Sequence, residues 1–282
     1  MTATTKTKFA VTADDAGLRL DQILPRHVAG LSRRKARSVI DLGGVFVDRS
    51  RVKVAGRTLR AGQVVEIVMG AVIERGEQPD KAFELVHEDP AFVIVNKPAG
   101  LVTAPTPESD RGDLLDLIGR RFGEVYLVHR IDMPTSGLLV FARTRDANKT
   151  LGDAFKAHDV EREYRAVAVG AVAAQTIDRP IEGKRAVTHV EPLESLAGAT
   201  LVAARLETGR THQIRIHLAG LGHPVAGDRA HGGEASRTFL PRAPRLALHA
   251  AVLGFAHPIT GERLRWERPI PDELAQWIER LR

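Results

Sequence analysis

Residues 125–143 read VYLVHRIDMPTSGLLVFAR, and they place two apolar runs on either side of a polar turn. The runs 125–130 and 138–143 are rich in β-branched and aliphatic residues, which is typical of strands. The turn between them contains Asp132 together with Pro, Thr, Ser and Gly, the residue types that favour tight turns. An aspartate in such a turn is held by the strands on both sides and is open to a cleft, where a carboxylate can act.

The chain after residue 83 shows many strand patterns and few helical ones. Strands are predicted in FELVHEDPAFVIVNKPAG (83–100), which contains a hairpin signal, in YRAVAVG (164–170) and in TLVAARLE (200–207). Helical spacing occurs in the segment with Ala147, Leu151 and Phe155 on one face and in THQIRIHLAG (211–220). This mixture predicts an α+β domain built on a large, mostly antiparallel mixed sheet.

The first quarter of the chain has the pattern of a separate small α/β domain. Leu20, Ile23 and Leu24 have the spacing of one helix face, which predicts a short helix over 18–27. A second helix begins at the N-cap Ser32 and ends at Gly43-Gly44. The apolar segments 45–47 and 64–69 then predict short strands.

Positive charge is concentrated in this first quarter. The whole chain has a formal net charge of +6, but residues 1–70 hold 13 Lys and Arg against 6 Asp and Glu. The remaining residues carry 28 basic groups against 29 acidic ones. Arg33, Arg34 and Arg37 lie on the second predicted helix and are expected to point outward together. We therefore expect the small domain to bind a polyanion.

Composition excludes several classes of protein. The 282 residues contain no cysteine, which excludes disulfides, thiolate metal sites and cysteine nucleophiles. Apolar residues make up 43% of the chain, enough for a globular core, yet no uninterrupted apolar run reaches the roughly 18 to 20 residues of a membrane-spanning helix. The opening MTATTKTKFAVTADD lacks the apolar run of a secretory signal. We expect a folded cytoplasmic protein without membrane association.

The small domain resembles the alpha-L RNA-binding motif first known from a ribosomal small-subunit protein. The matching segments are RLDQIL (19–24), SRRKARSVIDLGGVFVD (32–48) and LRAGQVVEI (59–67). The resemblance implies that this domain anchors RNA through phosphate contacts, with salt-dependent and weakly sequence-specific affinity. The side chains it implicates are Ser32, Arg33, Arg34 and Arg37.

A second constellation lies far from Asp132 in the chain. The segment ETGRTHQIRIHLAGLGHPVAGD (207–228) packs Arg210, His212, Arg215 and His217 into eight positions among apolar residues. Such a cluster is unfavourable unless something pairs with it. An arginine that pairs with a carboxylate would hold the carboxylate ionised and oriented.

From about residue 83 to its end the chain resembles the RluA family of pseudouridine synthases. Five motifs occur in the family's order: NKPAGLV (96–102), HRIDMPTSGLLV (129–140), EREYRAVAVG (161–170), LETGRTHQIRIHLAGLGHPVAGD (206–228) and LHAAVLGFAHPITGE (248–262). The resemblance implies an enzyme that isomerises uridine in structured RNA by breaking the C1′–N1 bond and forming a C1′–C5 bond. It implies no metal and no cofactor.

The resemblance also implies a role for each matching residue. Asp132 corresponds to the essential aspartate, which attacks the sugar C1′ or the uracil ring. Tyr164 corresponds to the aromatic residue that stacks on the target base, and Arg215 to the basic residue that pairs with the aspartate. Arg130 corresponds to an arginine that enters the RNA when the target base leaves its stack. The departures from the family pattern are mild, with Ile131 in place of a usual leucine.

These patterns give a domain prediction. We expect a tail over 1–15, the RNA-binding domain over 16–70, a linker over 71–82 and the synthase domain over 83–282. Large-subunit ribosomal RNA is the expected substrate, because family members with this basic domain often act on it, and transfer RNA is the alternative. The chain is expected to act as a monomer with no obligate protein partner.

Three other functions compete with this one. A metal-dependent hydrolase is disfavoured because His212 and His217 are five apart and diverge by roughly 140° on a helix. A glycosidase normally needs a second carboxylate, whereas the resemblance places arginine and tyrosine with Asp132. A non-catalytic protein that binds or remodels ribosomal RNA stays open, because the basic domain would serve it equally well.

Overall fold

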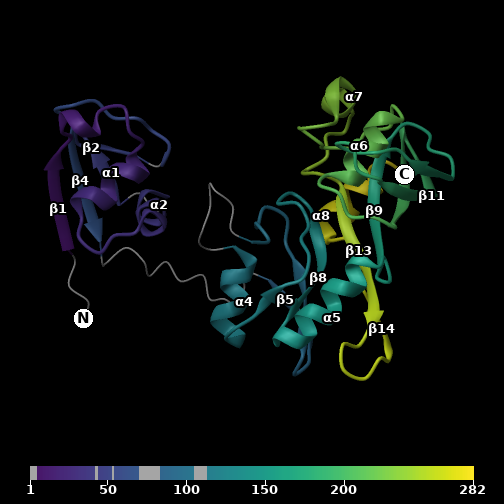
Figure 1. Cartoon of the computed structure of the whole chain (residues 1–282). Helices are drawn as coiled ribbons and strands as arrows, with labels where there is room; N and C mark the ends of the chain where they lie inside the picture. The colour runs from purple at the N-terminus through teal and green to yellow at the C-terminus, as the bar shows by residue number, and fades with distance from the viewer. Residues whose placement is uncertain (1–4, 42–43, 53, 70–82, 105–112) are drawn as a thin grey trace. The chain divides into compact units, whose positions relative to one another are not determined.

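The computed structural model describes residues 5–41, 44–52, 54–69, 83–104 and 113–282 (Figure 1). The chain divides into two compact units, one of residues 1–79 with 104–116 and one of residues 80–103 with 117–282. The division falls inside α4 (Leu114–Phe122). The predicted linker over 71–82 lies outside the described residues.

The small unit combines short helices with a four-stranded antiparallel sheet in the order β1-β4-β2-β3. Its elements are β1 (Thr5–Ala10), the 3-10 helix η1 (Ala13–Asp15), α1 (Leu20–His27), α2 (Arg33–Asp41), β2 (Val45–Val47), β3 (Ser50–Arg51) and β4 (Val64–Met69). The apolar face predicted for the first helix is buried in one core with Ala36, Val39 and Ile40 of the second helix and with strand residues Val45, Val65 and Ile67. The two helices and two of the strands are therefore confirmed.

Residues 5–10 correct the prediction of an N-terminal tail, because they form β1 and pair with β4. The segment TKTKFA alternates threonine and lysine, a pattern that suits an edge strand with solvated charges. Lys6 forms a 2.8 Å ion pair with Glu66 on the neighbouring strand. Only Phe9 adds to the apolar core, so the segment has little hydrophobic signal in the sequence.

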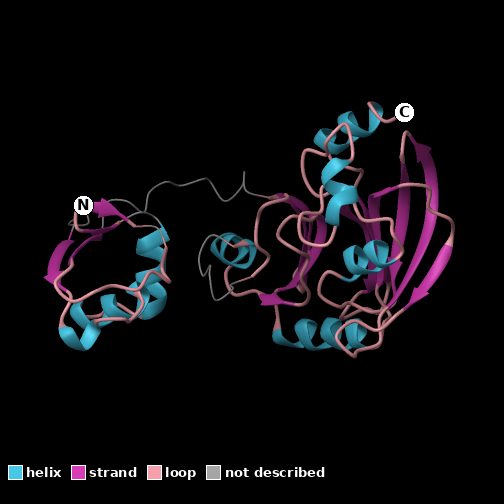
Figure 2. Ribbon diagram, turned by 90° about the horizontal axis from the view of Figure 1, so that it is seen from above, coloured by secondary structure: helices cyan, strands magenta, loops and turns pink. Residues whose placement is uncertain are grey.

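The large unit is built on a single ten-stranded sheet, and its helices pack along that sheet (Figure 2). The main strand order is β10-β11-β12-β9-β13-β8-β6-β5, with β14 paired to β13 and β7 paired to β8. The strands are β5 (Glu84–Glu88), β6 (Phe92–Lys97), β7 (Tyr126–Leu127), β8 (Ser136–Ala142), β9 (Glu161–Val169), β10 (Gln175–Asp178), β11 (Val187–Leu196), β12 (Ala199–Leu206), β13 (Leu248–Ala256) and β14 (Arg263–Glu267). The β8–β13 pair is parallel and the other pairs in this sheet are antiparallel. The predicted α+β fold is confirmed.

The helices of this unit after α4 are α5 (Arg145–Lys156), α6 (Gln213–Gly220), α7 (Gly233–Thr238) and α8 (Asp272–Glu279). α5 begins where the hydroxyl of Thr144 accepts a 3.2 Å hydrogen bond from the Ala147 N–H, an N-cap that satisfies a free donor of the first turn. Ala147 and Leu151 of α5 are buried against Phe92 and Phe255 of the sheet. This packing fixes α5, and with it Phe155, beside β8.

The first run of the stretch 125–143 forms less strand than its composition predicts. β7 covers only Tyr126 and Leu127, and the chain then leaves β8. The imidazole Nε2 of His129 accepts a 3.2 Å hydrogen bond from the Val140 N–H, which a further strand residue would have bonded. Residues 128–132 are thereby free to line a pocket instead of continuing the sheet.

Gly137 permits a close backbone approach between two strands of the sheet. It lies on β8 opposite Ala250 of β13 with φ +126°, and a Cβ placed on it would come within 2.3 Å of the Ala250 carbonyl oxygen. No residue with a side chain fits this position. The glycine therefore allows the parallel β8–β13 contact that lies directly after the Asp132 turn.

No helix among the residues described is both long and apolar enough to cross a membrane.

Candidate active site

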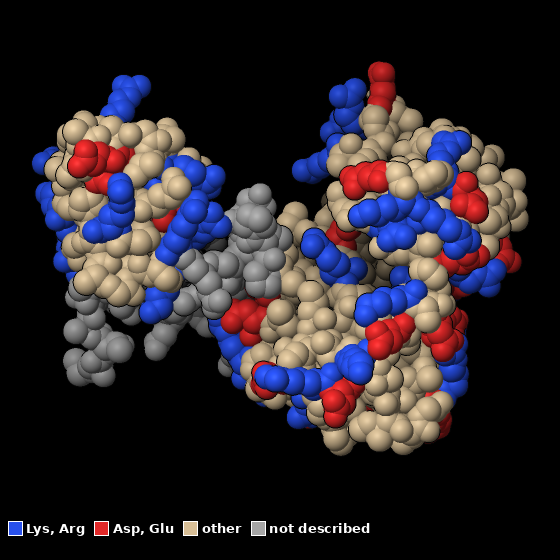
Figure 3. Space-filling view, viewed as in Figure 1, with Lys and Arg blue, Asp and Glu red and all other residues tan. Residues whose placement is uncertain are grey.

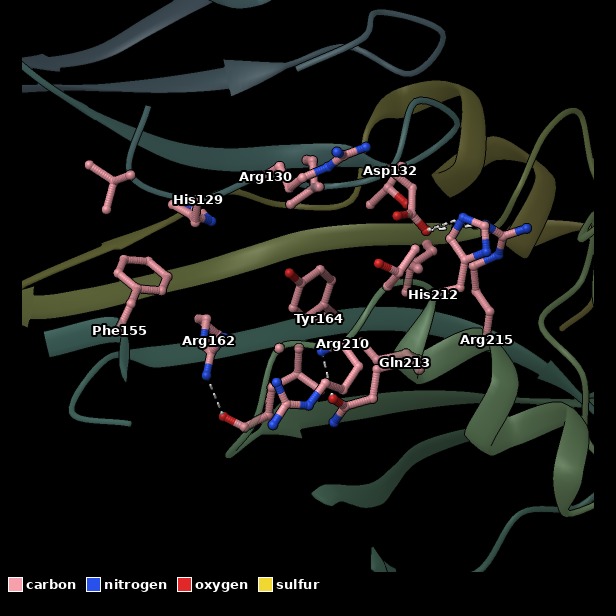
Figure 4. A pocket seen from close by; sticks show the side chains of 18 of the residues that line it. His129, Arg130, Asp132, Phe155, Arg162, Tyr164, Arg210, His212, Gln213 and Arg215 are labelled. Atoms are coloured by element: carbon pink, nitrogen blue, oxygen red, sulfur yellow. Dashed lines mark hydrogen bonds and ion pairs between the residues drawn. The ribbon is translucent and has the colours of Figure 1, made fainter. Parts of the chain in front are cut away.

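A pocket of about 610 Å³ opens in the large unit beside the start of β8 (Figure 4). Its walls come from the loop before β8, from α5, from β9 and from the start of α6. Asp132, Tyr164 and Arg215 all line it. The structure therefore brings together the three residues to which the sequence assigns the reaction.

The turn that carries Asp132 is braced by the segment after β6. The Thr135 N–H donates a 3.1 Å hydrogen bond to the Asp132 carbonyl and closes the turn. The Gly100 N–H donates to the Met133 carbonyl at 2.8 Å, and the buried hydroxyl of Thr103 donates to the Ile131 carbonyl at 2.8 Å. Backbone carbonyls on both sides of Asp132 are thus held by the NKPAGLV segment and the threonine that follows it, which fixes where the carboxylate points.

Arg215 connects Asp132 to a second carboxylate. Its Nη1 donates a 3.1 Å hydrogen bond to Oδ2 of Asp132, while Nε and Nη2 each donate a 2.8 Å bond to Asp228. The Arg215 side chain is 5% exposed and that of Asp132 is 21% exposed. Arg215 is therefore a buried brace at the pocket wall, and the Asp132 carboxylate is the more exposed of the two groups.

Burial and hydrogen bonding compete at this brace, and hydrogen bonding prevails. Burial alone would raise the pKa of Asp228, but the bonds from Arg215 and from the N–H groups of Ala230 and His231 hold that pKa below its ordinary value. Burial alone would lower the pKa of Arg215, but its bonds to Asp228 and Asp132 raise it. The guanidinium therefore stays charged and fixed in orientation.

Tyr164 lies on β9, across β13 from the Asp132 turn. Ala250 of β13 pairs with Tyr164 on one side and with Gly137 on the other, so the three residues form a row across the sheet. The Tyr164 side chain is 9% exposed. Burial raises the pKa of Tyr164 to about 12; the positive charge of Arg162 opposes this shift, and the negative charge of Asp132 adds a smaller contribution to it. The phenol is therefore protonated at neutral pH.

His212 is a second residue of the pocket wall that lies close to Asp132. Its backbone is left-handed, with φ +57° at the N-cap of α6, a conformation that is strained for a residue with a side chain. Its Nε2 lies 3.7 Å from the Asp132 carboxylate, and its Nδ1 contacts His231 at 2.8 Å. Burial lowers the pKa of His212, although Asp132 opposes the shift. His217 points elsewhere and contacts Thr188 and the Arg179 carbonyl.

Lys97 is the unexpected charged group beneath the turn. It is fully buried, and its Nζ donates hydrogen bonds to the carbonyls of Pro98, Leu101 and Met133 at 2.9, 2.7 and 3.2 Å. Burial lowers the pKa of Lys97 to about 7, and the charge of Asp132 opposes this shift. Lys97 therefore ties the loop after β6 to the residue next to Asp132.

Comparison with known proteins agrees with this geometry. A model of the RNA pseudouridylate synthase family matches residues 91–220, and a model of the S4 domain matches residues 18–65. A "Ribosomal large subunit pseudouridine synthase D" of Vibrio vulnificus is 34% identical over 94% of this chain and 91% of its own length. The chain belongs to the RNA pseudouridylate synthase family.

Other relatives of this synthase agree. The protein of the same name from Escherichia coli is 34% identical over 96% of this chain and 93% of its own length. Among solved structures, "Human RNA Pseudouridylate Synthase Domain Containing 4" is 25% identical, covers 70% of this chain and 92% of its own, and has a TM-score of 0.57. "Human RNA Pseudouridylate Synthase Domain Containing 1" covers 74% and 97% with the same identity and TM-score. The RluA resemblance read from the motifs is confirmed.

In the S4 domain of this synthase, Arg33 and Arg37 share a partner that the sequence did not indicate. Each donates through Nε to Oδ2 of the buried Asp21, at 3.1 and 2.6 Å. Burial would raise the pKa of Asp21, but these arginines lower it. The Ser32 hydroxyl accepts a 3.1 Å bond from the Lys35 N–H, which confirms the predicted N-cap. The side chain of Arg34 lies outside the described residues.

Asp21 thus orients Arg33 and Arg37, two of the arginines that are expected to bind RNA, because both donate a hydrogen bond to it through Nε. Lys and Arg cover more of this unit's surface than Asp and Glu on the face seen in Figure 3. This positive surface agrees with the charge predicted for residues 1–70. Phosphate contacts of Ser32, Arg33, Arg34 and Arg37 stay a prediction.

Three residues of the synthase site were missed by the sequence reasoning: Lys97, Arg162 and Asp228. Asp228 is the last residue of the motif 206–228, and Lys97 is a charged residue at the end of an apolar strand. Arg162 lies two positions before Tyr164, so the alternation of β9 places both on one face of the sheet. All three residues lie within the family motifs, but the resemblance assigned no role to them.

Proposed function

We propose that this synthase isomerises uridine to pseudouridine in large-subunit ribosomal RNA, with Asp132 as the attacking carboxylate. The observation that carries the proposal is the 3.1 Å bond between Arg215 and Asp132 at the wall of an open pocket. The printed names of the bacterial relatives favour ribosomal RNA as the substrate. Such a substrate also favours a cytoplasmic location.

The reaction requires one nucleophile and no external reagent. The Asp132 carboxylate attacks either C1′ of the ribose or the uracil ring, and the C1′–N1 bond breaks. The uracil then turns within the pocket, the C1′–C5 bond forms and the carboxylate is released. The proton on C5 is lost and N1 gains one, so the product has the same composition as the substrate. Arg215 supports the step by keeping Asp132 ionised and aimed at the pocket.

Tyr164 holds the base and assists with the C5 proton. Its ring stacks on the flipped uracil, and stacking is worth about 1–3 kcal/mol per base. Its raised pKa keeps the hydroxyl neutral in the resting enzyme. When Asp132 forms a covalent adduct, its negative charge disappears, and with it one of the causes of that raised pKa. The phenol then passes its proton to water more readily, and the resulting phenolate can accept the proton from C5, which restores the neutral phenol.

Arg130 meets the RNA from the outer side of the pocket. Its side chain is exposed, lines the pocket, and makes no hydrogen bond or ion pair with another described residue. A base inside folded RNA must leave its stack before Asp132 can reach it, at a cost of a few kcal/mol. Arg130 offsets this cost by taking the place of the base, while the S4 domain anchors the RNA elsewhere.

Purified protein and unmodified RNA test the proposal. Transcripts of large-subunit ribosomal RNA and of transfer RNAs from the same organism are incubated with the protein, and pseudouridine is mapped by carbodiimide modification and primer extension. We expect new pseudouridines in the ribosomal transcript. Pseudouridine formation confined to transfer RNA would overturn the assignment of ribosomal RNA as the substrate. RNA binding without pseudouridine formation in either transcript would support the non-catalytic alternative.

A further inference from the structure

Arg162 is a buried cation in the pocket for which the proposed reaction has no use. It lies on β9, is 8% exposed and lines the pocket. Its Nη2 donates to the carbonyls of Leu206 and Glu207 at 3.5 and 2.9 Å, and its guanidinium lies 5.5 Å from the centre of the Phe155 ring. Its Nε is buried without a hydrogen-bond partner. Desolvation of this kind is unfavourable unless an anion compensates it.

No carboxylate supplies that compensation within the part of the chain that the structure describes. Arg162 has no ion pair there, and burial lowers its pKa. Asp132 is the one acidic residue among those that line the pocket, and Arg215 already pairs with it. The pocket wall also includes Arg130 and Arg210, neither of which has a carboxylate partner among the described residues. The pocket therefore has more positive charge than its own residues neutralise.

The position of Arg162 separates it from the reacting group. In Figure 4, Asp132 and Arg215 lie at one end of the pocket, Phe155 and His129 lie at the other, and Tyr164 lies between them. Arg162 and Tyr164 share a face of β9 at a spacing of about 7 Å along the strand. A base held at Tyr164 is joined through its ribose to a phosphate on each side, so one of these phosphates has to lie near the target nucleoside.

The groups around Arg162 suit a phosphate better than a base. Burial lowers the pKa of His129 to about 3, so this imidazole is neutral and adds no competing charge. The Phe155 ring stacks on His129, with 4.5 Å between the ring centres, and it also contacts the guanidinium of Arg162. The ring that would otherwise stack a flanking base is thus already engaged on the protein side. A planar guanidinium matches the oxygens of a phosphodiester.

We propose that the end of the pocket formed by Arg162, Phe155 and His129 is a subsite for an RNA backbone phosphate next to the target uridine. The inference rests on the proposed function, because it takes the target nucleotide to be held at Tyr164. The bound phosphate neutralises Arg162 and fixes the strand, so that the target ribose faces Asp132.

Arg162→Met tests the subsite, because methionine keeps an apolar side chain against Phe155 and removes the charge. Arg162→Lys keeps the charge, and Arg165→Met is the matched control, since Arg165 lies on the opposite face of the same strand. Binding of a large-subunit ribosomal RNA transcript is measured over a range of salt concentrations, and a thermal melt checks that each variant is folded. We expect Arg162→Met to weaken binding about 10-fold and to reduce the salt slope by about 0.7–0.9, the effect of leaving one phosphate without its cation.

Arg162→Lys should retain the salt slope, and Arg165→Met should retain both slope and affinity. An unchanged slope in a folded Arg162→Met protein would overturn the subsite, even if affinity falls, because a contact to a base or a packing role does not release counterions. Pseudouridine formation by the wild type is scored separately. Its absence overturns the proposed function, whereas the comparison of slopes still tests the subsite.

A second measurement removes the charge of the RNA instead of that of the protein, and its wild-type arm does not depend on how a variant folds. A synthetic RNA that contains the mapped uridine carries one neutral methylphosphonate at a flanking position. In the wild type this linkage should raise KM about 10-fold at one of the two positions. In the Arg162→Met protein the same methylphosphonate linkage should raise KM no further, because the two changes remove the same contact. Additive losses at both positions would contradict the inference.

Discussion

Asp228 accepts two hydrogen bonds of 2.8 Å from Nε and Nη2 of Arg215, and these bonds orient Nη1 toward Asp132. Asp228 is itself held by the N–H groups of Ala230 and His231. The orientation of the proposed nucleophile therefore depends on a carboxylate that does not line the pocket.

Asp228→Asn should lower kcat at least about 10-fold, because a charge-assisted bond worth about 1.5–3 kcal/mol no longer orients Arg215. It should also reduce the free energy of unfolding by up to about 3–5 kcal/mol, since the buried Arg215 loses one of its two carboxylate partners and keeps only Asp132. Urea unfolding and steady-state kinetics measure the two effects. Asp153→Asn, which breaks the exposed pair with Lys156, is the control and should change stability by less than about 1 kcal/mol.

Tyr164→Phe keeps the ring and removes the hydroxyl. If the hydroxyl assists proton removal from C5, kcat should fall by about 100-fold, and KM should change little because stacking is preserved. Tyr164→Leu should raise KM as well. Steady-state kinetics on a transcript that contains the mapped uridine separates the two roles. Equal kcat for Tyr164→Phe and the wild type would leave Tyr164 a stacking residue only.

Lys97 should make stability depend on pH. Its pKa is about 7 in the folded protein against the usual 10.5, so the unfolded chain binds more protons between these values. Wild-type stability should therefore rise with pH across this window, relative to Lys97→Met, by up to about 1.4 kcal/mol per pH unit. Urea unfolding at about pH 7 and about pH 9.5 measures the difference. A difference that does not vary with pH would show that Lys97 is not desolvated as the structure indicates.

Removal of residues 1–75 should weaken RNA binding and lower its dependence on salt. Each phosphate that the S4 domain no longer neutralises should reduce the salt slope by about 0.9 on duplex regions. Filter binding over a salt series measures the slope, and a thermal melt should show that the synthase domain stays folded. An unaltered slope would mean that the S4 domain does not anchor the substrate.

Much of the fold could be predicted because its signals are local. The face formed by Ala147 and Leu151 indicated α5, and the spacing of Leu20, Ile23 and Leu24 indicated α1. β1 could not be predicted in the same way, because lysine and threonine alternate in it and the partner strand β4 lies more than 50 residues later. Its structure depends on pairing with β4 rather than on its own residues.

The part of the site that could be predicted consists of residues whose position in a family motif marks them as reactive or charged. Asp132 lies in a polar turn between two apolar runs, and its pairing with Arg215 followed from the family motifs. The roles of Lys97, Arg162 and Asp228 depend on distances between segments that no local pattern contains. The same is true of Asp21, which pairs with arginines 12 and 16 residues away.

Asp132→Asn tests the proposed mechanism most directly, because it removes the charge of the nucleophile and keeps its size and the turn around it. The wild type and the variant are compared on the same large-subunit ribosomal RNA transcript, first for binding and then for pseudouridine by primer-extension mapping. We expect the variant to bind with an affinity close to that of the wild type and to form no pseudouridine. Pseudouridine formed by Asp132→Asn at the wild-type position would contradict the assignment of Asp132 as the attacking group.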